Sequence, residues 1–118
     1  MKKIVLAEGN QDTRFILSKV LNNAGYKVES LDGPNIVEGK AQVPDVFILD
    51  QEIPTIDGFA LSKFLRLQKE TKQVPIIMLS SYPELQRKAK QIGITDFLTK
   101  QFQTSHLLQV IEKHVNRA

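Results

Sequence analysis

One carboxylate, Asp50, follows directly after the uninterrupted apolar run of residues 46–49. A short run of β-branched and aromatic residues predicts a strand that is buried on both faces, as in the middle of a parallel sheet. Asp50 would then stand at the carboxyl end of a central strand, where ligands and chemistry collect in open α/β sheets. We therefore take Asp50 as the candidate reactive residue.

Three further polar side chains, Glu8, Ser80 and Lys100, end other predicted strands. Because the carboxyl ends of parallel strands meet at one edge of a sheet, we expect them to converge on Asp50. Together the set supplies a nucleophilic oxygen, an oxygen ligand for a divalent cation, a hydroxyl donor and an ammonium, which are the groups that phosphoryl chemistry needs. Taken singly, each also has an ordinary explanation as a helix cap or a solvated surface group.

The spacing of apolar residues predicts five strands and five helices that alternate along the chain. Regular alternation is typical of a parallel sheet covered on both faces, so we expect a three-layer α/β/α sandwich. His106 and His114 fall in the last helix, away from Asp50, and are expected at the surface. The predicted strands are 3–7, 26–31, 46–50, 76–80 and 95–99, and the helices are about 12–24, 35–42, 58–69, 83–92 and 104–115.

Composition indicates one domain that spans residues 1–118, because a chain of this length buries a single core. The absence of cysteine excludes disulfides, thiolate chemistry and cysteine-zinc sites, and fits a reducing cytoplasm. The first apolar run, residues 4–7, is too short for a signal peptide or a membrane span. The net charge of +3 is modest, and the basic cluster at 87–90 is interpreted as a solvated helix face. We therefore expect a cytoplasmic protein that binds neither membrane nor nucleic acid.

Four motifs follow one another along the chain: FILD at 47–50, IPTIDG at 53–58, PIIMLSS at 75–81 and DFLTKQF at 96–102. In these motifs, and over essentially its full length, the sequence resembles the receiver domains of two-component response regulators. The resemblance implies a flavodoxin-like (βα)5 fold with the parallel strand order 2-1-3-4-5. It also implies a phosphorelay signalling domain, not an enzyme, with a histidine kinase or phosphotransfer protein as phosphoryl donor.

The resemblance assigns roles to individual residues. Asp50 would accept the phosphoryl group, Ser80 would hydrogen-bond a phosphoryl oxygen, and Lys100 would pair with its charge. Phe97 would be the aromatic residue whose rotamer reports the state. The face formed by residues 83–115 would pass that state to an output domain or a protein partner.

The chain departs from the family pattern at the end of its first strand, where receivers usually carry two adjacent acids and this chain has Glu8 and Gly9. The expected magnesium ligands are therefore Glu8, Asp50 and the main-chain carbonyl of Glu52, together with water. Because magnesium keeps several waters, the missing acid weakens the site without necessarily abolishing it. The side chain of Glu52 and that of Asp12 are possible substitutes, with solvation and helix capping as the alternatives.

A second departure follows Lys100, where the family typically has a proline after a cis peptide bond and this chain has Gln101. A cis bond before a non-proline residue costs roughly 2.5–4 kcal/mol. We therefore expect a trans bond and a different loop before the last helix.

Two classes of function stay open at this point. A phosphorylation-gated switch is favoured by Asp50, Ser80 and Lys100, whereas Gly9 and Gln101 favour a degenerate receiver that binds partners without phosphate. A flavin- or nucleotide-binding enzyme on the same fold is less favoured, because no glycine-rich phosphate loop follows the first strand.

Overall fold

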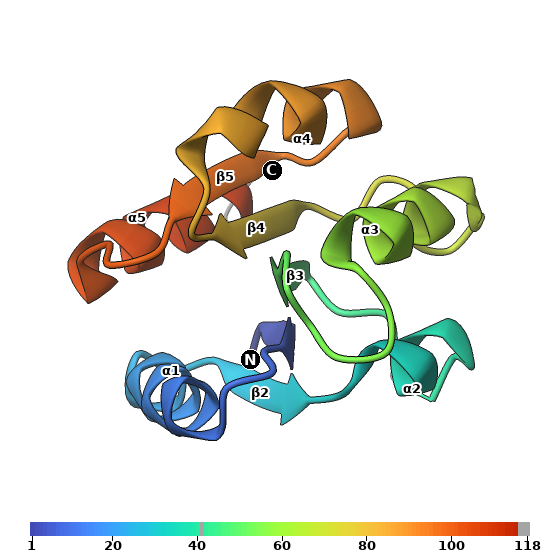
Figure 1. The fold of residues 1–118 in the computed structure, drawn as a ribbon. Helices are drawn as coiled ribbons and strands as arrows, with labels where there is room; N and C mark the ends of the chain where they lie inside the picture. The colour runs from blue at the N-terminus through green and yellow to red at the C-terminus, as the bar shows by residue number, and fades with distance from the viewer. Residues whose placement is uncertain (41, 116–118) are drawn as a thin grey trace.

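The computed structural model of the chain describes residues 1–40 and 42–115, which form a five-stranded parallel sheet with helices on both faces (Figure 1). The strands are β1 (Lys3–Ala7), β2 (Lys27–Ser30), β3 (Val46–Asp50), β4 (Ile76–Ser80) and β5 (Asp96–Thr99). The helices are α1 (Gln11–Asn23), α2 (Gly33–Val37), α3 (Gly58–Leu67), α4 (Gln86–Ile92) and α5 (Thr104–Val115), and the short 3-10 helix η1 (Pro83–Leu85) leads into α4.

The strand order is β2-β1-β3-β4-β5, and every neighbouring pair is parallel. The predicted three-layer, flavodoxin-like architecture is therefore confirmed, together with the strand order that the resemblance implied. All five residues of β3 are buried, because the strand lies in the middle of the sheet between β1 and β4. The sheet thus places Asp50, the last residue of β3, at the centre of its carboxyl edge.

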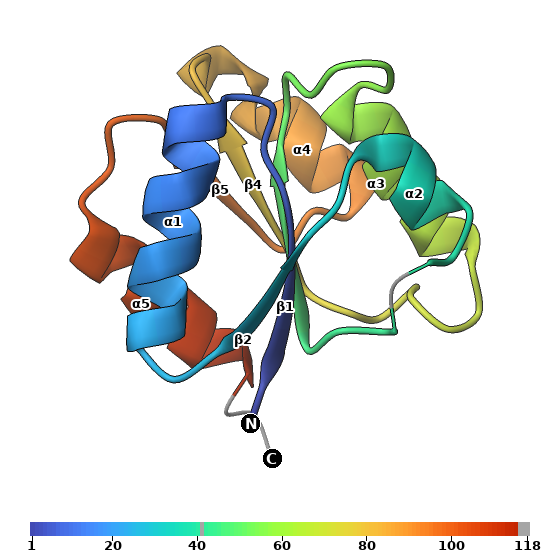
Figure 2. The same cartoon turned by 90° about the horizontal axis from the view of Figure 1, so that it is seen from below.

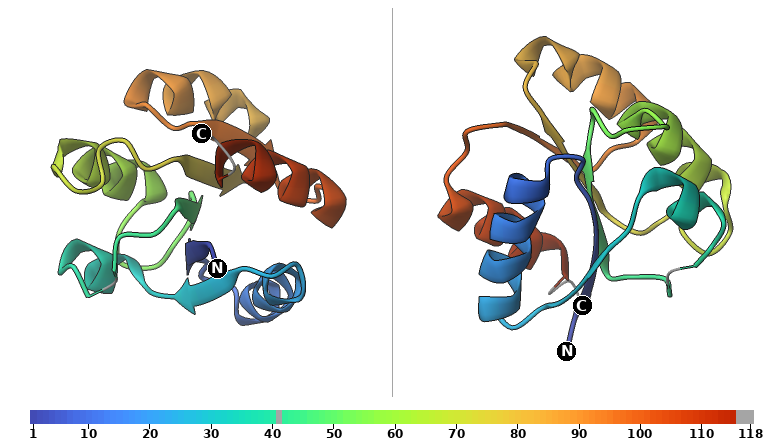
Figure 3. Two further views of the ribbon diagram at one scale, coloured as in Figure 1. Left: turned by 180° about the vertical axis from the view of Figure 1, so that it is seen from behind. Right: turned by 60° about the horizontal axis from the view of Figure 1, so that its bottom comes forward.

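Helices α1 and α5 cover one face of the sheet, and α2, α3 and α4 cover the other (Figures 2 and 3). Each layer buries its own apolar cluster against the strands. Leu21 and Ile111 pack with Ile48 on the α1–α5 face, and Leu61 packs with Leu49 on the opposite face. Because successive residues of a strand point to opposite faces, the neighbours Ile48 and Leu49 belong to different clusters.

Local sequence signals determine several helix ends. The side chain of Asn10 accepts a hydrogen bond from the main-chain N of Thr13 (2.9 Å) and caps α1. Asp57 caps α3 in the same way through the main-chain N of Phe59 (3.0 Å). Helix α4 ends at Gly93, whose φ of 96° is in the left-handed region that glycine adopts without steric cost.

The helix predicted for residues 35–42 is wrong in its bounds, since α2 spans Gly33–Val37. Asp32 accepts a hydrogen bond from the main-chain N of Asn35 (2.8 Å), so the helix begins earlier than predicted. Residue 41, within the predicted range, lies outside the described residues. The bounds of the other predicted elements agree with the structure to within three residues. No helix within the described ranges combines the length and the apolar composition that a bilayer crossing needs.

The prediction that both histidines lie at the surface is wrong for His114. Its side chain is buried and pairs through Nε2 with the carboxylate of Asp96, the first residue of β5. Leu107 and Ile111 precede it by seven and three residues, so helical spacing puts His114 on the buried side of α5. His106 is exposed, as expected.

Two leucines of α3 provide a test of this packing. Leu65 is 2% exposed and Leu67 is 82% exposed. We expect Leu65→Ala to lower the free energy of unfolding by about 2–5 kcal/mol, because it leaves a cavity in the core. The matched variant Leu67→Ala should change it by less than about 0.5 kcal/mol. Urea unfolding followed by circular dichroism measures both, and similar losses for the two variants would contradict the described packing.

Candidate functional site

Asp50 is held at the carboxyl edge of the sheet with both carboxylate oxygens in contact with donors. Its side chain is 1% exposed. The Oδ1 atom accepts a hydrogen bond from the main-chain N of Glu52 (2.8 Å), and Oδ2 pairs with the ammonium of Lys100. The turn after β3 and the end of β5 therefore position this carboxylate from two sides.

Glu8 follows β1 directly and brings a second buried carboxylate to the same place. Its Oε1 accepts a hydrogen bond from the main-chain N of Asn10 (3.0 Å) and lies 3.7 Å from Nζ of Lys100. Its Oε2 is buried and has no hydrogen-bond partner among the described residues. Burial, and after it the neighbouring carboxylate of Asp50, raises the pKa of Glu8 to about 7. Glu8 is therefore a carboxyl group that lacks a full set of partners.

Lys100 supplies the positive charge between the two carboxylates. Its main-chain N donates to the carbonyl of Ser80 (2.7 Å), which ties the segment after β5 to the end of β4. Burial lowers the pKa of the ammonium, but Asp50 and the charges of Glu8 and Glu52 outweigh this and raise it above its usual value. The following peptide bond is trans, as predicted, and Gln101 has a φ of 77°.

The structure does not bring the hydroxyl of Ser80 to Asp50. Its Oγ donates to Oε1 of Gln51 (3.4 Å) and accepts from the main-chain N of Tyr82 (3.0 Å). The sheet register explains this: Asp50 is paired with Leu79, so Ser80 lies beside the following residue, Gln51. No sequence pattern singles out Gln51, although it directly follows Asp50.

Phe97 lies in β5 with its neighbour Met78 in β4. Its side chain is half-buried and packs against the apolar cluster beneath α2, α3 and α4. Ser80 follows Met78 by two residues, so strand alternation directs both toward this same face. Phe97 and Ser80 therefore share the α2–α4 side of the sheet.

Gly9 is packed against the turn after β3. A Cβ atom at this position would lie 2.7 Å from Cδ of Pro54 and 3.6 Å from the main-chain carbonyl oxygen of Glu52. The side chain of Glu52 is exposed, and Asp12 is exposed in the first turn of α1, where Asn10 is the cap. Both acids are thus exposed, unlike the buried carboxylates of Glu8 and Asp50.

The described residues contain no group of three or more acidic, histidine or cysteine side chains placed to hold a metal ion. The available donors are the carboxylates of Glu8 and Asp50 and the carbonyl of Glu52. The buried Oε2 of Glu8 has no hydrogen-bond partner within residues 1–40 and 42–115, and a bound cation would supply one. Because magnesium binds through one or two carboxylates and retains several waters, this donor set fits it.

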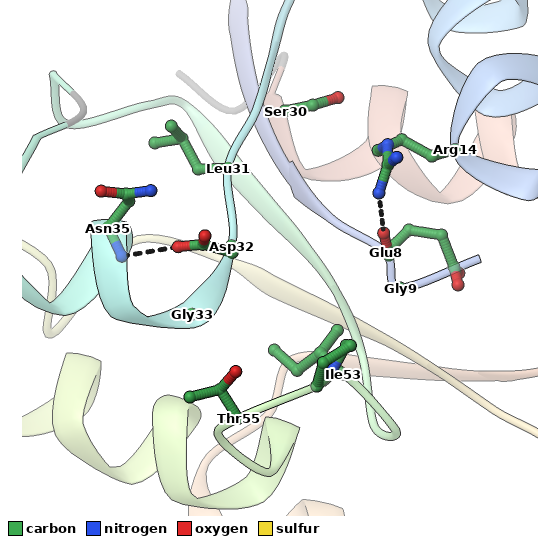
Figure 4. A pocket seen from close by; sticks show the side chains of 11 residues that line it. Glu8, Gly9, Arg14, Ser30, Leu31, Asp32, Gly33, Asn35, Ile53 and Thr55 are labelled. Atoms are coloured by element: carbon green, nitrogen blue, oxygen red, sulfur yellow. Dashed lines mark hydrogen bonds between the residues drawn. The ribbon is translucent and has the colours of Figure 1, made fainter. Parts of the chain in front are cut away.

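Two surface hollows border Glu8. A pocket of about 440 Å³ is lined by Gly9 and by Arg14, whose Nη1 donates to the Glu8 carbonyl (2.9 Å; Figure 4). A second hollow of about 580 Å³ lies beside Lys100 and Phe102. Glu8 therefore lies at the border of two surface hollows, whereas Asp50 lines neither of them.

The pKa of Glu8 leads to a prediction for stability without metal. The unfolded chain releases this proton near pH 4.5, whereas the folded protein retains it to about pH 7. The stabilising contribution of Glu8 to the free energy of unfolding is therefore complete below pH 4.5 and is lost as the pH rises to about 7. We expect Glu8→Gln, which keeps a neutral side chain, to become progressively more stable than the unaltered protein across this window.

Urea unfolding in EDTA between pH 4.5 and 8 measures this difference. The exposed Glu52→Gln is the matched control and should show no comparable trend. A constant difference between Glu8→Gln and the unaltered protein across the pH range would contradict the raised pKa.

Comparisons with known proteins agree with this arrangement. The family model described as "Response regulator receiver domain" matches residues 4–112. The chain is 29% identical to the DNA-binding dual master transcriptional regulator RpaA of Synechocystis, over 99% of this chain and 50% of RpaA. It spans about half the length of RpaA and of the phosphate regulon regulator PhoB of Rhizobium meliloti.

Solved structures with the same fold cover nearly the whole chain. The chemotaxis response regulator CheY4 of Vibrio cholerae is 31% identical, with a TM-score of 0.87 over 96% of this chain and 98% of CheY4. The receiver domain of the sensor histidine kinase PA1611 of Pseudomonas aeruginosa, with magnesium coordinated in its active site cleft, is 26% identical. Its TM-score is 0.88 over 98% of each chain. From the family match and these likenesses together, the chain belongs to the response regulator receiver domain family.

Proposed function

We propose that this receiver domain takes a phosphoryl group from a histidine kinase or phosphotransfer protein onto Asp50 and thereby switches its interaction face. The observation that carries the proposal is the contact of the Lys100 ammonium with the buried carboxylates of Asp50 and Glu8. A buried nucleophilic oxygen beside a fixed positive charge is the arrangement that phosphoryl transfer requires.

In the proposed reaction, a carboxylate oxygen of Asp50 bonds to phosphorus as the bond between phosphorus and the donor's histidine nitrogen breaks. The product is an acyl phosphate on Asp50. Lys100 already pairs with Asp50 and remains near the charge that the phosphoryl group adds. The hydroxyl of Ser80 would donate a hydrogen bond to a phosphoryl oxygen. Its present hydrogen bond to Gln51 must break first.

Glu8, Asp50 and the carbonyl of Glu52 would hold the magnesium ion of this reaction. When bound, magnesium neutralises charge on the phosphoryl oxygens. The PA1611 receiver supports this assignment, because magnesium is coordinated in that protein's active site cleft. The lack of a carboxylate at Gly9 supports weaker binding here.

The changed state would be read at the face made by α4, β5 and α5, which contains Phe97. Rearrangement of Ser80 would alter the packing of Phe97, because both lie on the α2–α4 side of the sheet. The output would be a further domain or a separate protein. The similarity to RpaA, a DNA-binding transcriptional regulator of about twice this length, supports a transcriptional output.

A phosphate-independent interaction module is the second candidate. It is favoured by one observation: glycine at position 9 supplies no third carboxylate for a metal ion. The two functions differ in whether Asp50 becomes phosphorylated.

Asp50 and Asp57, the acids at the two ends of the turn between β3 and α3, test the choice of phosphoryl acceptor. We expect Asp50→Asn to abolish the mass increase of one phosphoryl group after incubation with acetyl phosphate and magnesium, because the nucleophilic oxygen is lost. Asp57→Asn is the matched control, since asparagine also caps a helix and α3 should remain intact. Intact-protein mass spectrometry measures both. Persistent phosphorylation of Asp50→Asn would identify another acceptor, and an unmodified parent protein would favour the second candidate.

The missing acid at position 9 gives a prediction for metal affinity. The backbone of Gly9 is not left-handed, but a Cβ would collide with the ring of Pro54, so the acid is introduced together with Pro54→Ala. We expect Gly9→Asp in the Pro54→Ala background to bind magnesium more tightly, on the order of tenfold, because it adds a carboxylate ligand. Gly9→Asn in the same background is the uncharged control. Equal dissociation constants for the two proteins in calorimetric titration would refute this role of position 9.

A further inference from the structure

The side chain of Gln51 contacts the only hydroxyl that the proposed function assigns to the phosphoryl group. Ser80 is fully buried at the end of β4, and Gln51 is half-buried in the turn after β3. The main chain of Gln51 is held from two sides: its N donates to the carbonyl of Leu79 (2.8 Å), and its carbonyl accepts from the N of Gly58 (3.0 Å). The amide side chain is therefore presented to Ser80 from a well-anchored backbone.

The hydrogen bonds of Ser80 leave no free proton for a phosphoryl group. A serine hydroxyl has one O–H donor and accepts through its lone pairs. The main-chain N of Tyr82 donates to Oγ at 3.0 Å, so this contact occupies an acceptor position. The single O–H is directed to Oε1 of Gln51 at 3.4 Å. Phosphoryl oxygens only accept, so Ser80 must leave Gln51 before it can bind one.

We infer that Gln51 is a positioning residue that holds the Ser80 hydroxyl away from Asp50 until a phosphoryl group competes for it. This inference rests on the proposed function, in which Ser80 donates to the phosphoryl group. The bond between Gln51 and Ser80 exists only in the unphosphorylated protein and stabilises that state. Gln51 thereby opposes activation, and its removal shifts the balance toward the phosphorylated form.

The length of the bond sets the size of the expected effect. At 3.4 Å it is at the long end of hydrogen-bond distances, so its contribution is modest. Loss of one neutral hydrogen bond corresponds to about a 2- to 10-fold change in an equilibrium constant. Gln51→Met should therefore tighten binding of a phosphoryl mimic by about 2- to 10-fold, because methionine has a similar length and no amide oxygen.

Beryllofluoride with magnesium is the probe, since it forms a non-covalent mimic of an aspartyl phosphate on Asp50. Isothermal titration compares the unaltered chain, Gln51→Met, Ser80→Ala and the double variant. We expect Gln51→Met to bind more tightly than the unaltered chain and Ser80→Ala more weakly. The double variant should bind as Ser80→Ala does, because Gln51 has no hydroxyl left to hold. Gln51→Ala is a second variant that should repeat the gain.

Other outcomes separate the inference from the proposed function. One such outcome is that beryllofluoride binds Gln51→Met and Gln51→Ala with the same affinity as the unaltered chain. That result overturns the inference and leaves the proposed function standing. The inference is also overturned if Gln51→Met tightens beryllofluoride binding equally in the unaltered chain and in Ser80→Ala. Gln51 would then act through a contact other than Ser80. If no protein of the set binds the probe, the proposed function fails and the inference fails with it.

Discussion

The contact of one ammonium with two buried carboxylates is the interaction on which the site depends. Glu8 and Asp50 come from the ends of neighbouring strands, and two negative charges so close together in a buried place repel each other. The Lys100 ammonium, which follows β5, offsets part of that repulsion, while burial and after it the Asp50 carboxylate raise the pKa of Glu8. Folding therefore favours the binding of a proton or a cation at this site.

The same sheet that gathers these charges also separates the other parts of the site. Strand alternation assigns Asp50 to the α1–α5 side, where Ile48 precedes it by two residues, and assigns Ser80 to the α2–α4 side with Met78. The charged groups and the hydroxyl thus belong to different layers. A phosphoryl group at the carboxyl edge would contact both layers, which gives a physical reason why modification of one carboxylate would affect the distant α4–β5–α5 face.

Close backbone contacts limit how this edge can change. Gly58 begins α3 so near the end of β3 that a Cβ would lie 2.5 Å from the carbonyl oxygen of Asp50, and Gly9 is packed against Pro54 in a similar way. The turn between β3 and α3 is therefore confined on both sides. An acid at position 9 would therefore have a steric cost in this chain as well as an electrostatic consequence.

The sequence alone determined the architecture, because apolar spacing, caps and glycine stops are local signals that each element carries. It also predicted that Asp50, Glu8 and Lys100 lie close together, since the carboxyl ends of parallel strands meet at one edge of the sheet. A helix of five residues carries little apolar periodicity, so the sequence pattern does not locate α2, whose N-cap is Asp32. The surface prediction for His114 is wrong because distance from Asp50 along the chain says nothing about burial, whereas its helical spacing matches the buried stripe of α5.

Only the tertiary structure decided which partner each polar group has. The register of β3 against β4 set Ser80 beside Gln51, and register depends on contacts between strands distant in sequence that no local pattern specifies.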